Sequence, residues 1–135
     1  LKGDEINLGN IHSTRDFTYI DDTIDAYIKC LNNQKIIGET FNLGTGYEIS
    51  IEKIVQLVAE ITNKKLKIKK DRLRVRPKNS EVDRLIASNS KSKKLLNWKP
   101  KFSDLNGFKK GLISTINWFD ANLDKINYKS NIYNL

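Results

Sequence analysis

Two arginine-centred clusters are the parts of this sequence with the clearest chemical potential. The first is the Thr-Arg-Asp-Phe run at residues 14–17, and the second, residues 72–76, leads into Glu81. A planar guanidinium group suits bidentate binding of phosphate, and a carboxylate suits the two hydroxyls of a ribose. Both clusters also have a plainer interpretation, a surface ion pair between Arg15 and Asp16 and a solvated basic loop. Spacing alone favours the plainer interpretation.

No cofactor-binding or catalytic motif stands beside these clusters. The turn Gly44-Thr45-Gly46 lacks the third glycine of a dinucleotide fingerprint, and no Gly-Lys-Ser/Thr sequence of a phosphate-binding loop occurs. No tyrosine is followed four residues later by a lysine. The single cysteine, Cys30, and the single histidine, His12, cannot build a cysteine- or histidine-rich zinc site. The sequence therefore predicts no catalytic, cofactor-binding or metal-binding residue in this chain.

The composition is that of a globular domain with a basic surface. Of the 135 residues 39% are hydrophobic and 30% charged, and 24 Lys and Arg against 16 Asp and Glu give a net charge of +8. This surplus suits an anionic partner, but much of it is lysine, which favours a solvated surface. No apolar run approaches the roughly 18 residues that a membrane span needs. The chain starts at Leu1 and contains no methionine, so we expect an excerpt of a longer protein.

Short apolar or alternating runs predict strands. We expect strands over residues 5–9, 17–20, 39–44 and 65–69. Lysines on alternate positions of the last run are typical of an edge strand that is protected against further pairing.

Helical spacing of apolar residues predicts helices between and after these strands. The first is capped by Asp21 or Asp22, the second by Ser50, the third covers residues 88–96 and ends at Asn97, and the fourth covers residues 104–122. Strands that alternate with helices predict an α/β fold of the mixed α+β kind, with short strands and about four helices.

Four segments resemble, in the right order, motifs of the extended short-chain dehydrogenases. Residues 9–22 resemble the RDF-x-YV-x-D segment of that family, and residues 41–46 resemble its NLGTG strand and turn. Residues 76–83 and 88–100 resemble its RP-x-x-SEVD and SKAKKLLGWKP segments. From Ile6 onward the chain is thus similar to the C-terminal portion of NAD-dependent nucleotide-sugar epimerases and dehydratases.

The resemblance implies a function for the arginine clusters. Arg15 and Arg76 would bind the diphosphate of a nucleotide sugar, and Glu81 would accept hydrogen bonds from its ribose. Ile6 would offer backbone groups to the base, and Leu8 would lie against the face of the base. Residues 1–135 would be the C-terminal substrate-binding domain of an extended Rossmann-type enzyme. NAD and the catalytic residues would belong to a missing N-terminal Rossmann domain, so the chain alone would be inactive.

The finer assignment rests on two segments. The SEVDRL sequence at residues 80–85 and the tail at 128–134 look closest to bacterial 4,6-dehydratases that act on UDP-N-acetylglucosamine in the legionaminic-acid-type pathway. Ser88 and Asn97 depart from the family's usual Asp and Gly, both at expected capping positions. A 4-epimerase stays open as an alternative. So do, from different classes, a small basic nucleic-acid-binding domain, which would carry surface aromatics among its lysines, and a purely structural domain.

The resemblance also sets expectations for partners and location. The parent would be a cytoplasmic homodimer that binds NAD and a nucleotide sugar. We expect it to bind neither nucleic acid nor a membrane. Helical spacing places Ile24, Ile28 and Leu31 on one helix face, which the family packs against the rest of the enzyme. We therefore expect the fragment to self-associate through this exposed apolar surface.

Overall fold

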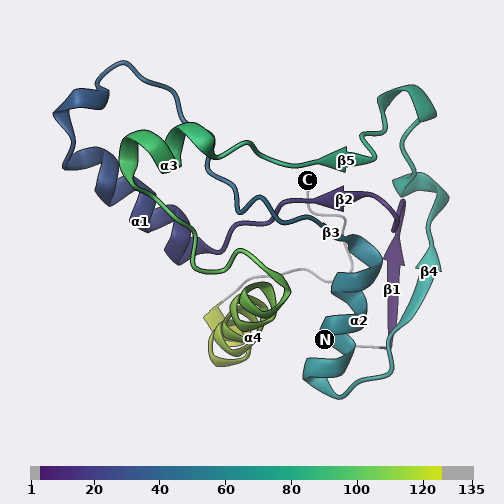
Figure 1. The fold of residues 1–135 in the computed structure, drawn as a ribbon. Coiled ribbons are helices and arrows are strands. Elements are labelled where there is room, and N and C mark those ends of the chain that lie inside the picture. The colour runs from purple at the N-terminus through teal and green to yellow at the C-terminus, as the bar shows by residue number, and fades with distance from the viewer. Residues whose placement is uncertain (1–3, 126–135) are drawn as a thin grey trace.

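Four helices and five short strands make up the part of the chain that the computed structural model describes, residues 4–125 (Figure 1). Their order is β1 (Glu5–Leu8), β2 (Thr14–Arg15), α1 (Ile20–Leu31), β3 (Ile49–Ser50), α2 (Ile51–Thr62), β4 (Lys67–Lys70), β5 (Arg84–Leu85), α3 (Ser90–Leu96) and α4 (Leu105–Asn122). Short 3-10 turns follow α1, β4 and α4. The predicted mixed α/β fold with about four helices is confirmed.

The strands form two small sheets. β1 and β4 run parallel, with Glu5 opposite Lys67 and Leu8 opposite Lys70. In the second sheet β2 is central, antiparallel to β3 and parallel to β5. Within residues 4–125, β4 pairs with β1 alone, as predicted for a lysine-bearing edge strand.

Two of the predicted strands are wrong. Residues 17–19 form no ladder, because the chain pairs earlier, at β2, and α1 already begins at Ile20. Residues 39–44 likewise have no strand partner in the described chain. Phe41 and Leu43 bury their side chains against the hydrophobic core instead, so the apolar pattern reports packing here and not sheet pairing.

Local capping signals are mostly confirmed. The Ser50 hydroxyl accepts a hydrogen bond from the amide of Lys53 at the start of α2, and Asn97 ends α3 in the left-handed conformation with φ 48°. The expected cap at Ser88 is wrong, because α3 begins at Ser90 with Asn89 as its N-cap.

Asp22 is not the cap of α1 but a buried anchor in its first turns. The N-cap is Tyr19, and Asp22 is 2% exposed. Its carboxylate accepts hydrogen bonds from the amides of Lys101 (2.8 Å) and Phe102 (3.0 Å), while the Trp98 indole donates to its carbonyl oxygen (3.0 Å). These contacts tie α1 to the segment between α3 and α4, where the fully buried Trp98 packs with the core.

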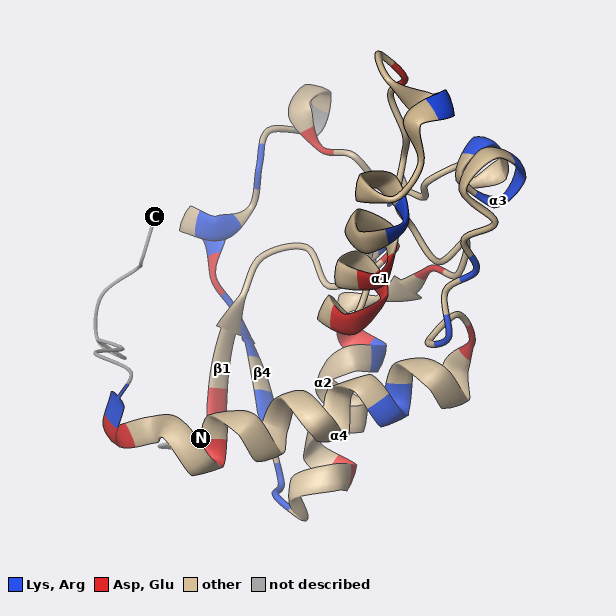
Figure 2. Cartoon of the chain, turned by 90° about the vertical axis from the view of Figure 1, so that its left-hand side faces the viewer, with Lys and Arg blue, Asp and Glu red and all other residues tan. Residues whose placement is uncertain are grey.

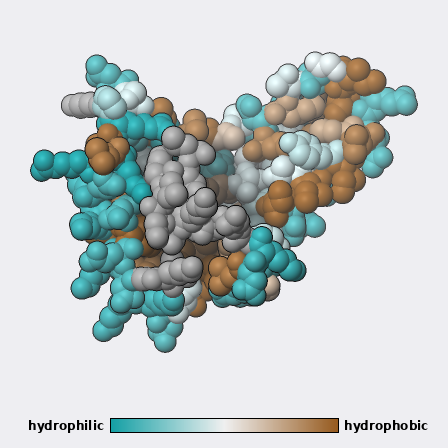
Figure 3. Space-filling view, turned by 180° about the vertical axis from the view of Figure 1, so that it is seen from behind, coloured by the Kyte–Doolittle hydropathy of each residue, from teal (hydrophilic) through white to brown (hydrophobic). Residues whose placement is uncertain are grey.

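The opposite face of α1 is open. Its exposed apolar residues are Ile20 (58%), Ile24 (48%), Tyr27 (61%), Ile28 (52%) and Leu31 (85%). Apolar side chains gather on the lobe formed by α1 and α3 when the molecule is seen from behind (Figure 3). This α1 stripe matches the predicted helix face, and no described element covers it.

Candidate functional site

A cavity with charged walls lies at the end of the β1–β4 sheet. Its volume is about 690 Å³, and it is lined by residues 9–12 after β1, Ile68 and Lys70 of β4, Glu52 of α2, and Val75, Arg76, Glu81 and Asp83 of the segment before β5. We call it the polar cavity. Lysines and arginines lie along β4 and along the segment after it (Figure 2).

Two of the predicted site residues line this cavity, and a third contacts one of them. Arg76 and Glu81 both line it. Arg15 approaches Glu81, with Nη2 3.9 Å from the Glu81 carboxylate and side chains that are 25% and 17% exposed. Arg15 therefore pairs with Glu81 and not with its neighbour Asp16, while Nη1 donates to the Thr14 carbonyl oxygen at 2.7 Å. The fold thus brings together the side chains of Arg15 and Glu81, which stand 66 positions apart, from 81 − 15.

The two remaining predicted residues lie beside the cavity and do not line it. Ile6 and Leu8 are half-buried on one face of β1. Their register partners, Ile68 and Lys70, do line the cavity. Because parallel partners share a face of the sheet, Ile6 and Leu8 lie on the sheet face that carries Ile68 and Lys70, next to the cavity.

The arginine-rich segment is held against β1 by close packing. A Cβ atom on Gly9 would lie 2.2 Å from the Arg74 carbonyl oxygen, so only glycine permits this approach. Asp71 accepts hydrogen bonds from the Leu73 amide (2.9 Å) and from the Arg74 side chain (3.0 Å), and the Asp71 amide donates to the Leu8 carbonyl oxygen at 2.9 Å. This packing places Arg76 at the cavity.

The sequence prediction missed several groups at this site. Lys70, Asp83 and Glu52 line the cavity, as does His12, whose Nδ1 lies 3.8 Å from Glu52. Lys70 departs from the lysine alternation of residues 65–69, because it stands on the same strand face as Ile68, so that pattern gave no signal for it. The cavity therefore carries cationic groups next to carboxylates, an arrangement suited to a ligand with both phosphates and hydroxyls.

Two carboxylates outside the cavity connect β2, the strand that carries Arg15, to the segments beside it. Asp16 accepts hydrogen bonds from the Thr45 amide (2.8 Å) and hydroxyl (2.6 Å), the Gly46 amide (3.0 Å) and the Ala87 amide (3.3 Å). Glu48 accepts from the Thr14 hydroxyl at 2.8 Å and from Arg84. The hydrogen bonds from Arg84, and then from Thr14, lower the pKa of Glu48 below its ordinary value.

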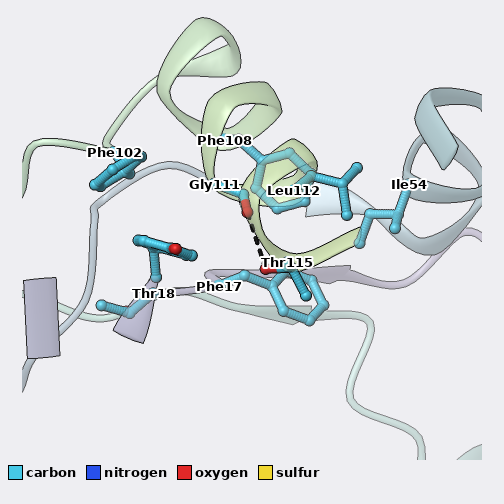
Figure 4. A pocket seen from close by; sticks show the side chains of 9 residues that line it. Phe17, Thr18, Ile54, Phe102, Phe108, Gly111, Leu112 and Thr115 are labelled. Atoms are coloured by element: carbon cyan, nitrogen blue, oxygen red, sulfur yellow. Dashed lines mark hydrogen bonds between the residues drawn. The ribbon is translucent and has the colours of Figure 1, made fainter. Parts of the chain in front are cut away.

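A second, smaller pocket has a different character. Its volume is about 290 Å³, and it lies between α4, α2 and the segment after β2 (Figure 4). Phe17, Phe108, Leu112 and Ile54 line it together with other uncharged residues. A phosphate would find no charged partner there, so the polar cavity is the candidate site for an anionic ligand.

No cluster of His, Cys, Asp or Glu in residues 4–125 could hold a metal ion. None of the helices in this region has the length and apolar character that crossing a membrane requires.

Comparison with known proteins identifies the class of protein to which this chain belongs. Residues 1–110 match the family described as GDP-mannose 4,6 dehydratase, so the chain belongs to this family. Its relatives include a UDP-glucuronate 4-epimerase, a GDP-6-deoxy-D-mannose reductase and a UDP-N-acetyl-alpha-D-glucosaminuronate decarboxylase.

Individual relatives agree with this assignment. The chain is 38% identical over 120 residues to a UDP-glucuronate 4-epimerase of Thermodesulfobacterium geofontis, covering 87% of this chain and 34% of the relative. A UDP-glucose 4-epimerase of Thermotoga maritima, solved with UDP-glucose, superimposes with a TM-score of 0.72 at 27% identity and covers 88% of this chain and 36% of that one. A UDP-glucuronic acid 4-epimerase of Bacillus cereus, solved with UDP-glucuronic acid and NAD, gives 0.71 at 30% identity, covering 87% and 35%. The chain spans about a third of the length of the relatives that it matches.

Proposed function

We propose that residues 1–135 are the nucleotide-sugar-binding domain of a cytoplasmic, NAD-dependent 4,6-dehydratase that acts on UDP-N-acetylglucosamine. The observation that carries this proposal is that Arg76 and Glu81 line one cavity and that Arg15 contacts Glu81 beside it. Two guanidinium groups complement two phosphates, and a carboxylate beside them complements a ribose diol. Family membership favours this enzyme class over a nucleic-acid-binding or purely structural domain.

Each site residue has a defined part in this proposal. Arg15 and Arg76 bind the diphosphate, Glu81 accepts from the ribose hydroxyls, and Ile6 and Leu8 lie next to the base. NAD, held by the part of the parent enzyme outside these residues, supplies the hydride acceptor when bound. Nucleotide binding at a distance from the reacting carbon then holds the sugar in the orientation that hydride transfer needs.

A 4-epimerase is the second candidate, because two of the similar solved structures are 4-epimerases. The two reactions differ in the mass of the product. Dehydration of UDP-N-acetylglucosamine gives a 4-keto-6-deoxy product that is lighter by one water, whereas epimerisation at C4 gives an isomer of the same mass. Mass spectrometry of the products of the complete enzyme, incubated with this substrate, distinguishes the two.

Titration of the complete enzyme with UDP tests the binding role. Arg76→Ala is expected to weaken binding by about 1.5–3 kcal/mol, the range for a hydrogen bond to a charged group. Arg76→Lys should recover part of this loss, because an ammonium keeps the charge without the fork. Glu81→Gln should cost less than either, because the amide oxygen still accepts.

The matched control is Arg72→Ala, an exposed arginine of the same segment that does not line the polar cavity. Its effect on UDP affinity should stay within about 0.5 kcal/mol, the usual range for surface substitutions. Wild-type affinity in Arg76→Ala would mean that the site residues have been assigned wrongly.

A further inference from the structure

Glu48 is a residue that touches all three strands around Arg15. It stands directly before β3, and its Oε2 accepts a hydrogen bond from the Thr14 hydroxyl of β2 at 2.8 Å. Both of its carboxylate oxygens accept from Nε of Arg84 in β5, at 2.8 and 2.7 Å, and Nη2 of Arg84 lies 2.7 Å from Oε1. One carboxylate thus connects the whole width of the sheet.

The sheet needs such a connection because its strands are very short. β2, β3 and β5 have two residues each. Two backbone hydrogen bonds support the β2–β5 pairing, from the Thr14 amide to Asp83 (2.8 Å) and from the Asp16 amide to Leu85 (3.0 Å). A slip by one residue would turn every side chain of a strand to the other face.

The same register sets the distance between Arg15 and Glu81. Arg15 directly follows Thr14, which pairs with Arg84, and Glu81 lies three positions before Arg84, from 84 − 81. Neither Glu48 nor Arg84 lines the polar cavity. We propose that Glu48 and Arg84 are positioning residues, which fix the β2–β5 register and thereby hold Arg15 against Glu81 in the geometry that binds a nucleotide diphosphate. This inference rests on the function proposed above.

The charge state of the pair supports this role at physiological pH. The pKa of Glu48 is lowered, first by the hydrogen bonds from Arg84, and the pKa of Arg84 is raised by Glu48. A lowered carboxyl pKa means that the contact is fully present above the ordinary value of about 4.3 and is lost only as the pH falls through the lower folded value. Both side chains are partly exposed, 27% for Glu48 and 65% for Arg84, so the pair contributes little to global stability.

The experiment is a double-mutant cycle in the complete enzyme, read by UDP titration at neutral pH. Glu48→Ala should weaken UDP binding about tenfold, while the unfolding temperature changes little. Arg84→Lys should weaken it less, since the charge remains and the fork is lost. In the Glu48→Ala background, Arg15→Ala should have a markedly smaller effect than in the wild type, because Arg15 is then already misplaced.

Glu60→Ala is the matched control. Glu60 forms a comparable exposed pair with Lys109, between α2 and α4, and its pKa is likewise lowered by that partner. Its loss should leave UDP affinity unchanged. An effect of Arg15→Ala that is additive with Glu48→Ala, or wild-type affinity in Glu48→Ala, overturns the positioning role and leaves the proposed function standing. Wild-type affinity in Arg15→Ala overturns both.

Discussion

The two ends of this molecule leave very different surfaces open. Around the polar cavity, many exposed groups are charged and several have partners within the chain, as Arg15 has Glu81 and Arg84 has Glu48. The exposed apolar residues Leu73, Val75 and Val82 stand singly between charged neighbours there. Along α1, the open surface is the apolar stripe from Ile20 to Leu31. Charged groups are stable in water, whereas covering an apolar stripe lowers the free energy of the protein. The cavity end is therefore built by this chain's own residues, and we expect the α1 end to be completed by other polypeptide.

The largest expected effect is on catalysis, and it tests whether this chain needs the other polypeptide that we expect to cover α1. The isolated 135-residue chain should show no turnover of UDP-N-acetylglucosamine, because its sequence has no catalytic tyrosine–lysine pair or glycine fingerprint. The measurement is product formation by the pure chain with added NAD, next to the complete enzyme as positive control. Turnover by the chain alone would mean that the catalytic groups lie within it.

Substitutions on the inner face of α1 should destabilise the chain, whereas substitutions on its outer face should have little effect. Asp22→Ala is expected to destabilise the chain by about 3 kcal/mol, because the amides of Lys101 and Phe102 lose their buried acceptor. Asp21→Ala, at the exposed neighbouring position, serves as control and should change the unfolding free energy by no more than about 0.5 kcal/mol. Denaturant unfolding measures both; equal effects would show that the contacts of Asp22 do not fix α1.

At the cavity end, Gly9→Ala tests whether packing positions the arginine segment. The new methyl group must displace the Arg74 backbone, so we expect a loss of about 1–3 kcal/mol in stability. Since Arg76 moves with that segment, UDP affinity of the complete enzyme should fall as well. Asn7→Ala, at an exposed position of the same strand, should change neither quantity. A Gly9→Ala variant that binds UDP normally would show that Arg76 is placed by other contacts.

What the sequence predicted well was local. The cap at Ser50, the stop at Asn97 and the lysine-bearing edge strand each depend on residues within a few positions of one another. Residues 39–44 were predicted as a strand because their apolar pattern is local too, but a ladder needs a partner strand, and the described chain supplies none. The same pattern is satisfied by packing Phe41 and Leu43 on the core.

The parts that could not be predicted depend on contacts between distant residues. Asp16 meets Thr45, and Glu48 meets Arg84, across separations of 29 and 36 positions. No spacing rule identifies such partners, so Arg15 and Asp16 looked like a simple ion pair. Arg15, Arg76 and Glu81 were found through their resemblance to a family, which supplied long-range information that spacing lacked. Their role as ligand groups stays a prediction.

The smallest expected effect on stability comes from the outer face of α1, and it bears most directly on the contrast between the two ends. Replacing both Ile24 and Ile28 by serine should change the unfolding free energy of the chain by no more than about 0.5 kcal/mol for each exposed site. The same change should reduce self-association, measured by light scattering, and the binding of a dye that reports exposed apolar surface, because the stripe loses its centre. Ile113→Ser, at an exposed isoleucine on α4, is the matched control and should leave association unchanged. If the Ile24 and Ile28 variant associates as strongly as the wild type, the α1 stripe is not the contact surface. If it instead unfolds, the stripe is already buried within the chain. The contrast between the polar cavity, built by this chain's own residues, and the uncovered α1 stripe would then be wrong.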